Sequence, residues 1–377
     1  MALSGLRILV TGAEGFIGKN LCVRLGEFPG VEVLKFTRGD DIPTLEFLIA
    51  KTDVIFHLAG ENRPEDPNAY MVTNHGLTAA LCGVVQNELA LSGRKIPIVF
   101  ASSSQSILNN PYGRSKRAGE QALESLANET DIPVTVFRLP GVFGKWCKPE
   151  YNSVVATFCH NVARGQPIHV SAPERCISLV YIDDVVDAFV EAVESAFQGY
   201  SISSVASEHT ISLGNLADLI RGFAEDRSAL RIENVGGGLE RALYATYISY
   251  LPLDSFSYEI PQHADSRGTF VEVLKTASCG QFSFLTAGPG VTRGGHYHHS
   301  KVEKFVVIQG DAHFKFRHIV TDERFEVRTS GEKPQVVETI PGWAHDITNV
   351  GKEDLIVMVW ANEVFDHERP DTIASKV

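Results

Sequence analysis

The chain has 377 residues, of which 44% are hydrophobic and 21% are charged, and its formal net charge at pH 7 is -12. This length suits two domains better than one core, and the composition is that of a globular protein. The negative charge argues against nucleic acid or an anionic membrane surface as a partner, and no apolar run is long enough to span a membrane.

The segment 1–245 alternates short apolar runs with runs of helical periodicity. Five apolar runs are rich in Val, Ile and Phe and are expected to be strands: LRILVTG, VEVLKF, DVIFHLAG, PIVFASSS and VTVFRLP. Helical patterns such as IGKNLCVRLGEF and SKRAGEQALESLANE lie between them. This alternation predicts a doubly wound α/β domain of the Rossmann type, with a parallel sheet covered on both faces.

A glycine-rich turn, TGAEGFIG, follows the first of these strands. Glycine allows positive φ and lets backbone N–H groups approach a pyrophosphate, which the N-terminus of the next helix also attracts. The spacing of the glycines alone is weak evidence of function. The position of the turn between a strand and a helix predicts a dinucleotide-binding site. The residues expected to contact the dinucleotide are Gly12, Gly15, Phe16, Ile17 and Gly18.

The end of the second strand, KFTRGD, bears on the choice of dinucleotide. NAD enzymes place an acid near this point for the ribose 2′-hydroxyl, whereas Thr37 and Arg38 stand here. An arginine forms charge-assisted hydrogen bonds to a 2′-phosphate. We therefore expect NADPH, with Arg38 as a ligand. NAD remains an alternative cofactor, because Asp40 and Asp41 stand close by. Arg38 would then only lie along the face of the adenine.

A serine-rich strand end and a helix supply the predicted catalytic groups. Ser102, Ser103 and Ser104 end the fourth strand, and Tyr112 and Lys116 follow in YGRSK. Residues four apart on a helix share a face. Lys116 is expected to hold the nicotinamide ribose and to lower the pKa of Tyr112, which exchanges a proton with a substrate carbonyl or hydroxyl. A bare YxxxK is often only a surface pair, so the prediction depends on the serines and the glycine turn.

These motifs resemble those of the extended short-chain dehydrogenase/reductase family, up to about residue 240. HLAG at 57–60, Asn74, RLPGVFG at 138–144 and YIDDVVDA at 181–188 also fit that pattern. The resemblance implies that Leu58, Ala59 and Gly60 contact the dinucleotide and that Ser104 is the catalytic serine. Only seven residues separate Ser104 from Tyr112, fewer than in many relatives, which implies a more open substrate pocket.

From about Leu251 the pattern changes to short alternating strands separated by Gly, Asp and Pro turns. The expected strands are FVEVLK, GQFSFLTA, EKFVVIQG, DAHFKFRH, RFEVRT and DLIVMVWANE, with no long helical pattern between them. This pattern predicts an all-β barrel or sandwich over residues 246–377. We expect the junction within 244–258, after three consecutive glycines.

A histidine-rich segment of this half fits a metal site. The spacing G(x)5HxH(x)4E(x)6G is met from Gly290 to Gly310, and PGWAHDITN adds a later histidine. Residues two apart on a strand share a face, so the first two histidines can hold one ion while His299 points away. Three nitrogens and a carboxylate suit one divalent metal per chain, with zinc favoured. The predicted ligands are His296, His298, Glu303 and His345; ordinary core or surface histidines are the alternative.

The metal spacing resembles that of the cupin superfamily, which includes 3,5-epimerases of nucleotide-linked 4-keto-deoxysugars. Those epimerases generally work without a metal, so the ion is either structural or a Lewis acid on a ketone. The pair of domains, with GKWCKPEYNSV and GGHYHHSKVEKF, resembles a family of capsular polysaccharide synthesis enzymes. That resemblance implies a homodimer that acts on a UDP-linked 4-keto-6-deoxy amino sugar.

In this interpretation the enzyme is bifunctional. The barrel epimerises C3 of a UDP-2-acetamido-2,6-dideoxy-4-hexulose, and the reductase domain reduces C4 with NADPH. The product, UDP-2-acetamido-2,6-dideoxy-L-talose, leads to UDP-N-acetyl-L-fucosamine.

Two other classes remain open at this stage. One is a single-activity 4-reductase with a non-catalytic barrel for dimerisation or sugar binding. The other is an NAD-dependent epimerase/dehydratase without net redox, against which Arg38 argues. Six scattered cysteines without CxxC, and a first strand where a leader would stand, predict reduced thiols and a cytoplasmic location.

Overall fold

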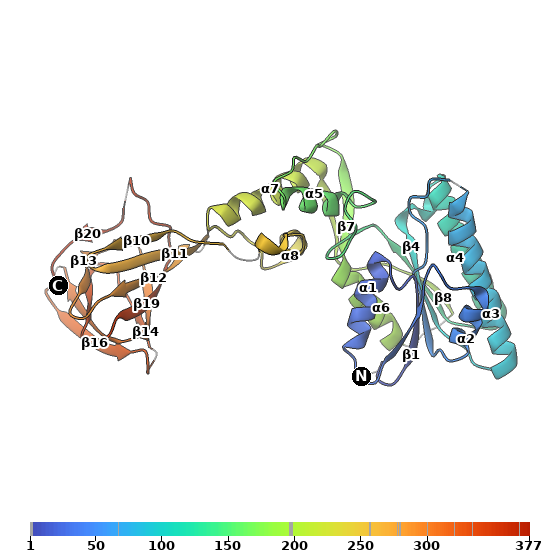
Figure 1. The fold of residues 1–377 in the computed structure, drawn as a ribbon, viewed down its shortest axis with the longest axis horizontal. Coiled ribbons are helices and arrows are strands. Elements are labelled where there is room, and N and C mark those ends of the chain that lie inside the picture. Colours follow the sequence, from blue (N-terminus) through green and yellow to red (C-terminus); the bar gives the residue numbers. More distant parts are fainter. Residues whose placement is uncertain are drawn as a thin grey trace. The chain divides into compact units, whose positions relative to one another are not determined.

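The computed structural model describes residues 3–66, 68–195, 199–255, 258–276, 278, 280–299, 301–319, 321–333, 335–368 and 370–377. The chain forms two compact units (Figure 1). The first runs to Ile220 and includes Gly237–Leu251, and the second consists of Arg221–Gly236 and Pro252–Val377. The predicted boundary at 245/246 falls inside helix α8 (Gly238–Ser249), which belongs to the first unit.

A six-stranded parallel sheet in the order β2-β1-β3-β4-β5-β8 forms the centre of the first unit. Its strands are β1 (Arg7–Thr11), β2 (Glu32–Phe36), β3 (Val54–His57), β4 (Ile98–Ser103), β5 (Val134–Leu139) and β8 (Tyr200–Ser203). All five predicted strands are present, and every residue of β3 and β4 is buried, which explains their continuous apolar runs. The winding direction reverses between β1 and β3, where ligands bind at the carboxyl ends of such sheets.

Helices cover both faces of this sheet. On one face, α1 (Phe16–Gly26) and α6 (Ile182–Glu194) share a core with the sheet, and on the other α2 (Ile42–Ile49), α3 (Leu77–Ser92) and α4 (Pro111–Thr130) do so. η1 (Met71–Gly76) runs into α3, and the chain also forms α5 (Val154–Val162) and α7 (Leu213–Ser228), which contribute to neither of these cores. Alternate residues of β1 enter different cores: Ile8 and Val10 pack with Phe189 of α6, whereas Leu9 packs with Leu81 and Leu123. A separate three-stranded sheet contains β6 (Gly141–Phe143), β7 (Cys176–Tyr181) and β9 (Glu208–Ser212).

The second unit contains two largely antiparallel sheets, in the orders β10-β11-β12-β19-β14-β17 and β16-β15-β18-β13-β20. Their strands are β10 (Gln262–Asp265), β11 (Gly268–Thr276), β12 (Gly280–Ala287), β13 (Thr292–Tyr297), β14 (Glu303–Gln309), β15 (Asp311–His318), β16 (Arg324–Ser330), β17 (Val336–Glu338), β18 (Trp343–Asn349), β19 (Leu355–Ala361) and β20 (Ile373–Ala374). Phe305 and Val357 of the first sheet share a core with Phe314 and Ile347 of the second. The predicted fold class, a Rossmann-type domain followed by an all-β domain, is confirmed.

Two expectations about the whole chain can be compared with the described residues. Within the described part of the chain, no helix combines the length and the apolar character that a membrane span requires. Cys22, Cys82, Cys147, Cys159 and Cys176 are free thiols, and the sixth cysteine, at 279, lies outside the described residues.

Candidate active site and metal site

The glycine turn brings helix α1 against the sheet at the β1–β3 switch point. Gly12 has φ +69°, and a Cβ there would lie 2.8 Å from the Cα of Ala59. A Cβ on Gly18 would lie 2.2 Å from the carbonyl oxygen of Gly12. No side chain caps the N-terminus of α1 at Gly15, so backbone N–H groups of its first turn are available to an anion. The turn therefore fits a pyrophosphate.

Arg38 lies two residues beyond β2 and is largely exposed, at 88% for its side chain. Its Nη2 donates to Oε2 of Glu61 at 2.8 Å. The two acids that kept NAD open are engaged locally. The carboxylate of Asp40 accepts from the backbone N–H of Thr37 at 2.6 Å, and Asp41 caps α2 through Thr44. Arg38 is thus paired with a residue distant in the sequence, whereas Asp40 and Asp41 are paired with their near neighbours.

The predicted catalytic pair stands on the first turns of α4. This helix begins at Pro111, and the side chain of Asn110 accepts the backbone N–H of Gly113 at 2.7 Å. Hydrogen bonding by the side chain of Ser103, the last residue of β4, lowers the pKa of Tyr112, whose ring lies 5.7 Å from that of Tyr70. The structure thus brings Ser103 to the phenol.

Ser104, the serine favoured by the family pattern, is exposed and begins a short 3-10 helix, η2 (Ser104–Ile107). Ser103 is the last residue of β4 and is buried, whereas the chain turns away at Ser104. The catalytic role of Ser104 stays a prediction. Ser103 is one of the three serines that the sequence offered, although the family pattern favours its neighbour Ser104.

The electrostatics of the pair differ from the expectation in one respect. Burial raises the pKa of Tyr112, and only the hydrogen bond with Ser103 opposes this rise. Lys116 is not among the groups that lower the pKa of Tyr112, and burial lowers the pKa of Lys116 itself to about 8. Its Nζ donates to the carbonyl of Ala101 at 3.0 Å.

Asn74 and Gly60 complete the surroundings of Lys116. The side chain of Asn74 donates to the Ser115 hydroxyl at 2.9 Å and accepts the backbone N–H of Glu61 at 2.7 Å. A Cβ on Gly60 would lie 2.9 Å from Oδ1 of Asn74 and 3.2 Å from Nζ of Lys116. The glycine that ends HLAG therefore makes room for the lysine, as a close-packed dinucleotide site requires.

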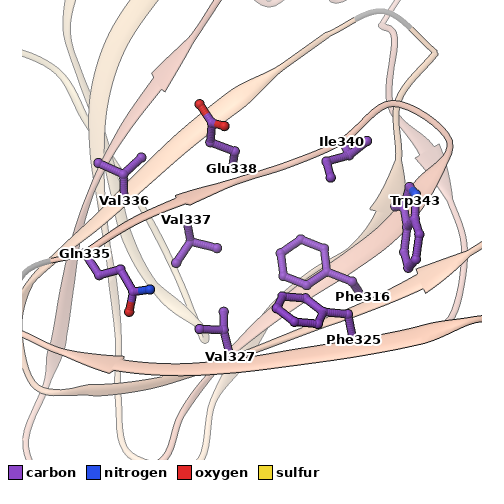
Figure 2. Close-up of a pocket in the computed structure, with 9 residues that line it drawn as sticks. All are labelled: Phe316, Phe325, Val327, Gln335, Val336, Val337, Glu338, Ile340 and Trp343. Carbon is purple, nitrogen blue, oxygen red and sulfur yellow. The ribbon is translucent and has the colours of Figure 1, made fainter.

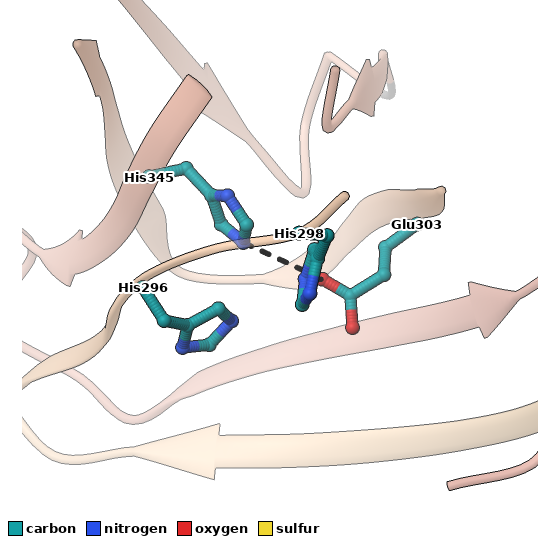
Figure 3. A group of neighbouring side chains, drawn as sticks. All are labelled: His296, His298, Glu303 and His345. Atoms are coloured by element: carbon teal, nitrogen blue, oxygen red, sulfur yellow. Dashed lines mark hydrogen bonds and ion pairs between the residues drawn. The ribbon is translucent and has the colours of Figure 1, made fainter. Parts of the chain in front are cut away.

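The four predicted metal ligands form one cluster in the second unit (Figure 3). Their nitrogen and carboxylate atoms all lie within 4.8 Å of one another. His345 is distant in the sequence but lies in the cluster, because the register of β13 and β18 pairs it with His296. His299 is exposed and outside the cluster, as the alternation predicted.

The hydrogen bonds of two histidines set their tautomers. Nδ1 of His298 lies against the carbonyl of Asp371, and Nδ1 of His345 lies 3.3 Å from the carbonyl of Trp343. A carbonyl only accepts, so each Nδ1 carries hydrogen, and a neutral ring then has a lone pair on Nε2. These Nε2 atoms lie 3.2 Å and 3.4 Å from Oε2 of Glu303.

Lone pairs directed at a carboxylate repel it unless a cation lies between them. Nε2 of His345 is buried and has no hydrogen-bond partner among the described residues. Burial, followed by the neighbouring His345, lowers the pKa of His296 to about 4, so this imidazole is neutral. Neutral imidazoles and an ionised carboxylate are the ligand forms that a divalent ion binds.

Two residues near the cluster were missed by the sequence reasoning. The backbone carbonyl of Asp371 lies against Nδ1 of His298. Its carboxylate accepts the backbone N–H of His299 at 2.8 Å. Lys301 is buried, and its Nζ lies 4.0 Å from Oε1 of Glu303. Asp371 stands near the end of the sequence, and no local spacing indicates that this segment returns to the histidines.

An apolar pocket of about 230 Å³ lies beside the cluster, between β15, β16, β17 and β18 (Figure 2). Phe316 forms part of its wall and is the cross-strand partner of His345, with ring centroids 6.3 Å apart. Trp343 lines it two residues before His345 on the same strand. The other lining residues are Phe325, Val327, Gln335, Val336, Val337, Glu338 and Ile340.

Comparison with known families identifies the class of protein. Residues 8–205 match the NAD dependent epimerase/dehydratase family, and residues 263–373 match the polysaccharide biosynthesis C-terminal domain. The chain belongs to the NAD dependent epimerase/dehydratase family.

Relatives that match the full length of the chain define its place within this family more narrowly. The chain is similar to CapF, the capsular polysaccharide assembling protein of Staphylococcus aureus, with 38% identity and a TM-score of 0.90 over 98% of this chain and 100% of that chain. A UDP-2-acetamido-2,6-beta-L-arabino-hexul-4-ose reductase of Pseudomonas aeruginosa is 54% identical over 99% of each chain. A CapF structure with the inhibitor 3-isopropenyl-tropolone matches 99% of this chain and 100% of that chain, with 35% identity and a TM-score of 0.85. The resemblance to capsular polysaccharide synthesis enzymes is thereby confirmed.

Proposed function

We propose that the chain is a nucleotide-sugar reductase that uses NADPH to reduce the C4 ketone of a UDP-linked 4-keto-6-deoxy amino sugar. The observation that carries this proposal is the Ser103, Tyr112 and Lys116 cluster beside the glycine turn. The 54% identity to a reductase of such a hexul-4-ose supports the substrate class. The product would be UDP-2-acetamido-2,6-dideoxy-L-talose.

The residues divide the chemistry between proton transfer and positioning. The dinucleotide, when bound at the glycine turn, supplies the hydride that reduces C4. Tyr112 gives its proton to the C4 oxygen, and Ser103 holds that oxygen by a hydrogen bond. Burial raises the pKa of Tyr112, so the phenol keeps its proton at neutral pH, which is the form that a reduction needs. The Lys116 ammonium donates hydrogen bonds to the nicotinamide ribose.

The direct test is the purified protein with the 4-keto sugar nucleotide and NADPH. We expect oxidation of one NADPH per substrate, with an NMR spectrum of the product that shows a hydroxyl-bearing C4. Conversion of the substrate without net consumption of NADPH would instead favour an epimerase or dehydratase with a tightly held NAD.

Arg38→Ala should change the cofactor preference. The exposed guanidinium would lose its charge-assisted hydrogen bond to the 2′-phosphate, which contributes roughly 1.5–3 kcal/mol. We expect NADPH binding to weaken about 10- to 100-fold, with little change for NADH, as measured by fluorescence titration. Arg24→Ala on α1, an exposed arginine paired with Glu27, is the matched control. Equal losses for both cofactors would exclude Arg38 as the phosphate ligand.

We propose in addition that the all-β unit is a cupin that inverts C3 of the same substrate. The supporting observation is the His/Glu cluster with its unpartnered Nε2 of His345, which adjoins the apolar pocket. A divalent ion held there would supply Lewis acidity to a ketone. The tropolone ring of the CapF inhibitor carries adjacent oxygen donors of the kind that chelate metals, which agrees with such a site. The alternative is a barrel that serves only for assembly of a homodimer.

The cluster should hold about one divalent ion per chain, zinc being the first choice. Elemental analysis of tag-free protein gives the stoichiometry. His296→Ala combined with His345→Ala should abolish binding, whereas His299→Ala, which changes an exposed neighbour, should leave it intact. Metal retained by the double variant would place the ion elsewhere.

A further inference from the structure

We propose that Glu120, together with Arg138, is a positioning residue of the reductase centre; this inference rests on the proposed function. Glu120 lies one helical turn after Lys116 on α4, and only 4% of its side chain is exposed. An ionised carboxylate is costly to bury unless its oxygens are satisfied by donors. The hydrogen-bond partners of Glu120 therefore indicate the role of its buried charge.

Those partners tie the catalytic helix to the ends of two strands. Oε1 of Glu120 accepts the Ser102 hydroxyl at 2.5 Å, and Oε2 accepts Nη2 of Arg138 at 2.7 Å. The register of β4 and β5 sets Ser102 and Arg138 side by side. Ser102 immediately precedes Ser103, the serine that hydrogen-bonds to Tyr112. The carboxylate thus fixes the helix that carries the phenol relative to the strand end that carries the serine.

The same carboxylate supplies a charge that Lys116 needs. Burial lowers the pKa of Lys116 to about 8, and the negative charge of Glu120 opposes this fall. His57, the titratable group that faces Lys116 from β3, is neutral, because burial lowers its pKa to about 3. Tyr112 keeps its proton, and the Ala101 carbonyl is uncharged. Glu120 is therefore the group that favours the ammonium form.

The sign of the expected effect follows from this arrangement. Glu120→Gln removes a charge that stabilises protonated Lys116, so the lysine deprotonates at lower pH. The basic limb of the kcat–pH profile should then move down by about one pH unit, the effect of one nearby charge. Glu124→Gln removes an exposed carboxylate one turn further along α4 and should leave the limb where it is.

Arg138→Gln provides the opposite change. It removes the positive charge that neutralises Glu120, so the basic limb should move up. Glu120→Gln combined with Arg138→Gln removes the pair without leaving an unpaired buried charge, and it should show a smaller downward shift than Glu120→Gln alone. Thermal denaturation shows whether each variant folds. If a single variant does not fold, the pH profile of the double variant still tests the proposal.

The outcomes separate the two proposals. A wild-type protein that does not oxidise NADPH with the 4-keto substrate would refute the proposed function. An active wild type whose basic limb is the same in the Glu120, Arg138 and Glu124 variants would overturn the inference alone. Loss of stability with an unchanged pH profile would also overturn it, since a purely structural ion pair has that signature.

Discussion

Tyr112→Phe is expected to abolish nearly all NADPH-dependent reduction while the protein still binds the dinucleotide. The variant keeps the aromatic ring that packs 5.7 Å from Tyr70 but loses the hydroxyl bonded to Ser103. General acid catalysis by a positioned side chain contributes about 100- to 10,000-fold, so kcat should fall by that factor. NADPH oxidation followed at 340 nm gives the rate, and a fluorescence titration gives cofactor affinity.

Neighbouring hydroxyls provide the controls for this variant. Tyr70→Phe removes a phenol that donates to the carbonyl of Asn62 and should change kcat little. Ser103→Ala should cost more activity than Ser104→Ala, because Ser103 contacts the phenol and Ser104 is exposed. A Tyr112→Phe enzyme with more than about a tenth of wild-type activity would remove the phenol from the mechanism.

The choice between the serines illustrates what a sequence pattern leaves undecided. The run of three serines at the end of the fourth strand predicts a polar strand end, and the structure places two of them in β4. Which hydroxyl reaches Tyr112 depends on where the strand stops and the 3-10 helix begins, and this point lies between Ser103 and Ser104. A one-residue change of that point would send a different side chain to the phenol.

Local spacing predicted that His296, His298 and Glu303 lie together, because these residues are close in the sequence; that they bind a metal stays a prediction. The ring centroids of His296 and His298 lie 4.9 Å apart, although His298 follows the end of β13 at Tyr297, and Glu303 belongs to the same motif. The contribution of Asp371 depends on the chain returning about 70 residues later, as does the addition of β20 beside β13. No periodicity or composition encodes such a return.

The position of the domain boundary also depends on contacts between segments that are distant in the sequence. The predicted junction relied on the change from helical to alternating patterns, which the structure bears out for the strands. The segment Arg221–Gly236 nevertheless belongs to the second unit, because its backbone pairs with β11: the N–H of Lys275 donates to Leu230, and that of Ile232 donates to Lys275. The residues that make these two backbone bonds follow the end of α7 at Ser228, and such a pairing leaves no trace in the hydrophobic pattern.

The second large effect expected is exchange of the C3 proton of the 4-keto substrate in heavy water without any NADPH. A proton on C3 is acidic only while C4 is a ketone, because the carbonyl stabilises the carbanion as an enolate. Reduction of C4 removes that acidity, so epimerisation must precede reduction. NMR or mass spectrometry of substrate incubated with the protein should therefore show deuterium at C3, while substrate already reduced at C4 should show none.

The variants assign this exchange to one unit or the other. Full-length Tyr112→Phe should still exchange C3, since its lost phenol serves only the proton transfer to the C4 oxygen. The variant with His296→Ala and His345→Ala should lose the exchange, because its ligand cluster is gone, whereas His299→Ala should keep it. Exchange that required NADPH or Tyr112 would mean that one site performs both steps, and the all-β unit would then be a scaffold for assembly.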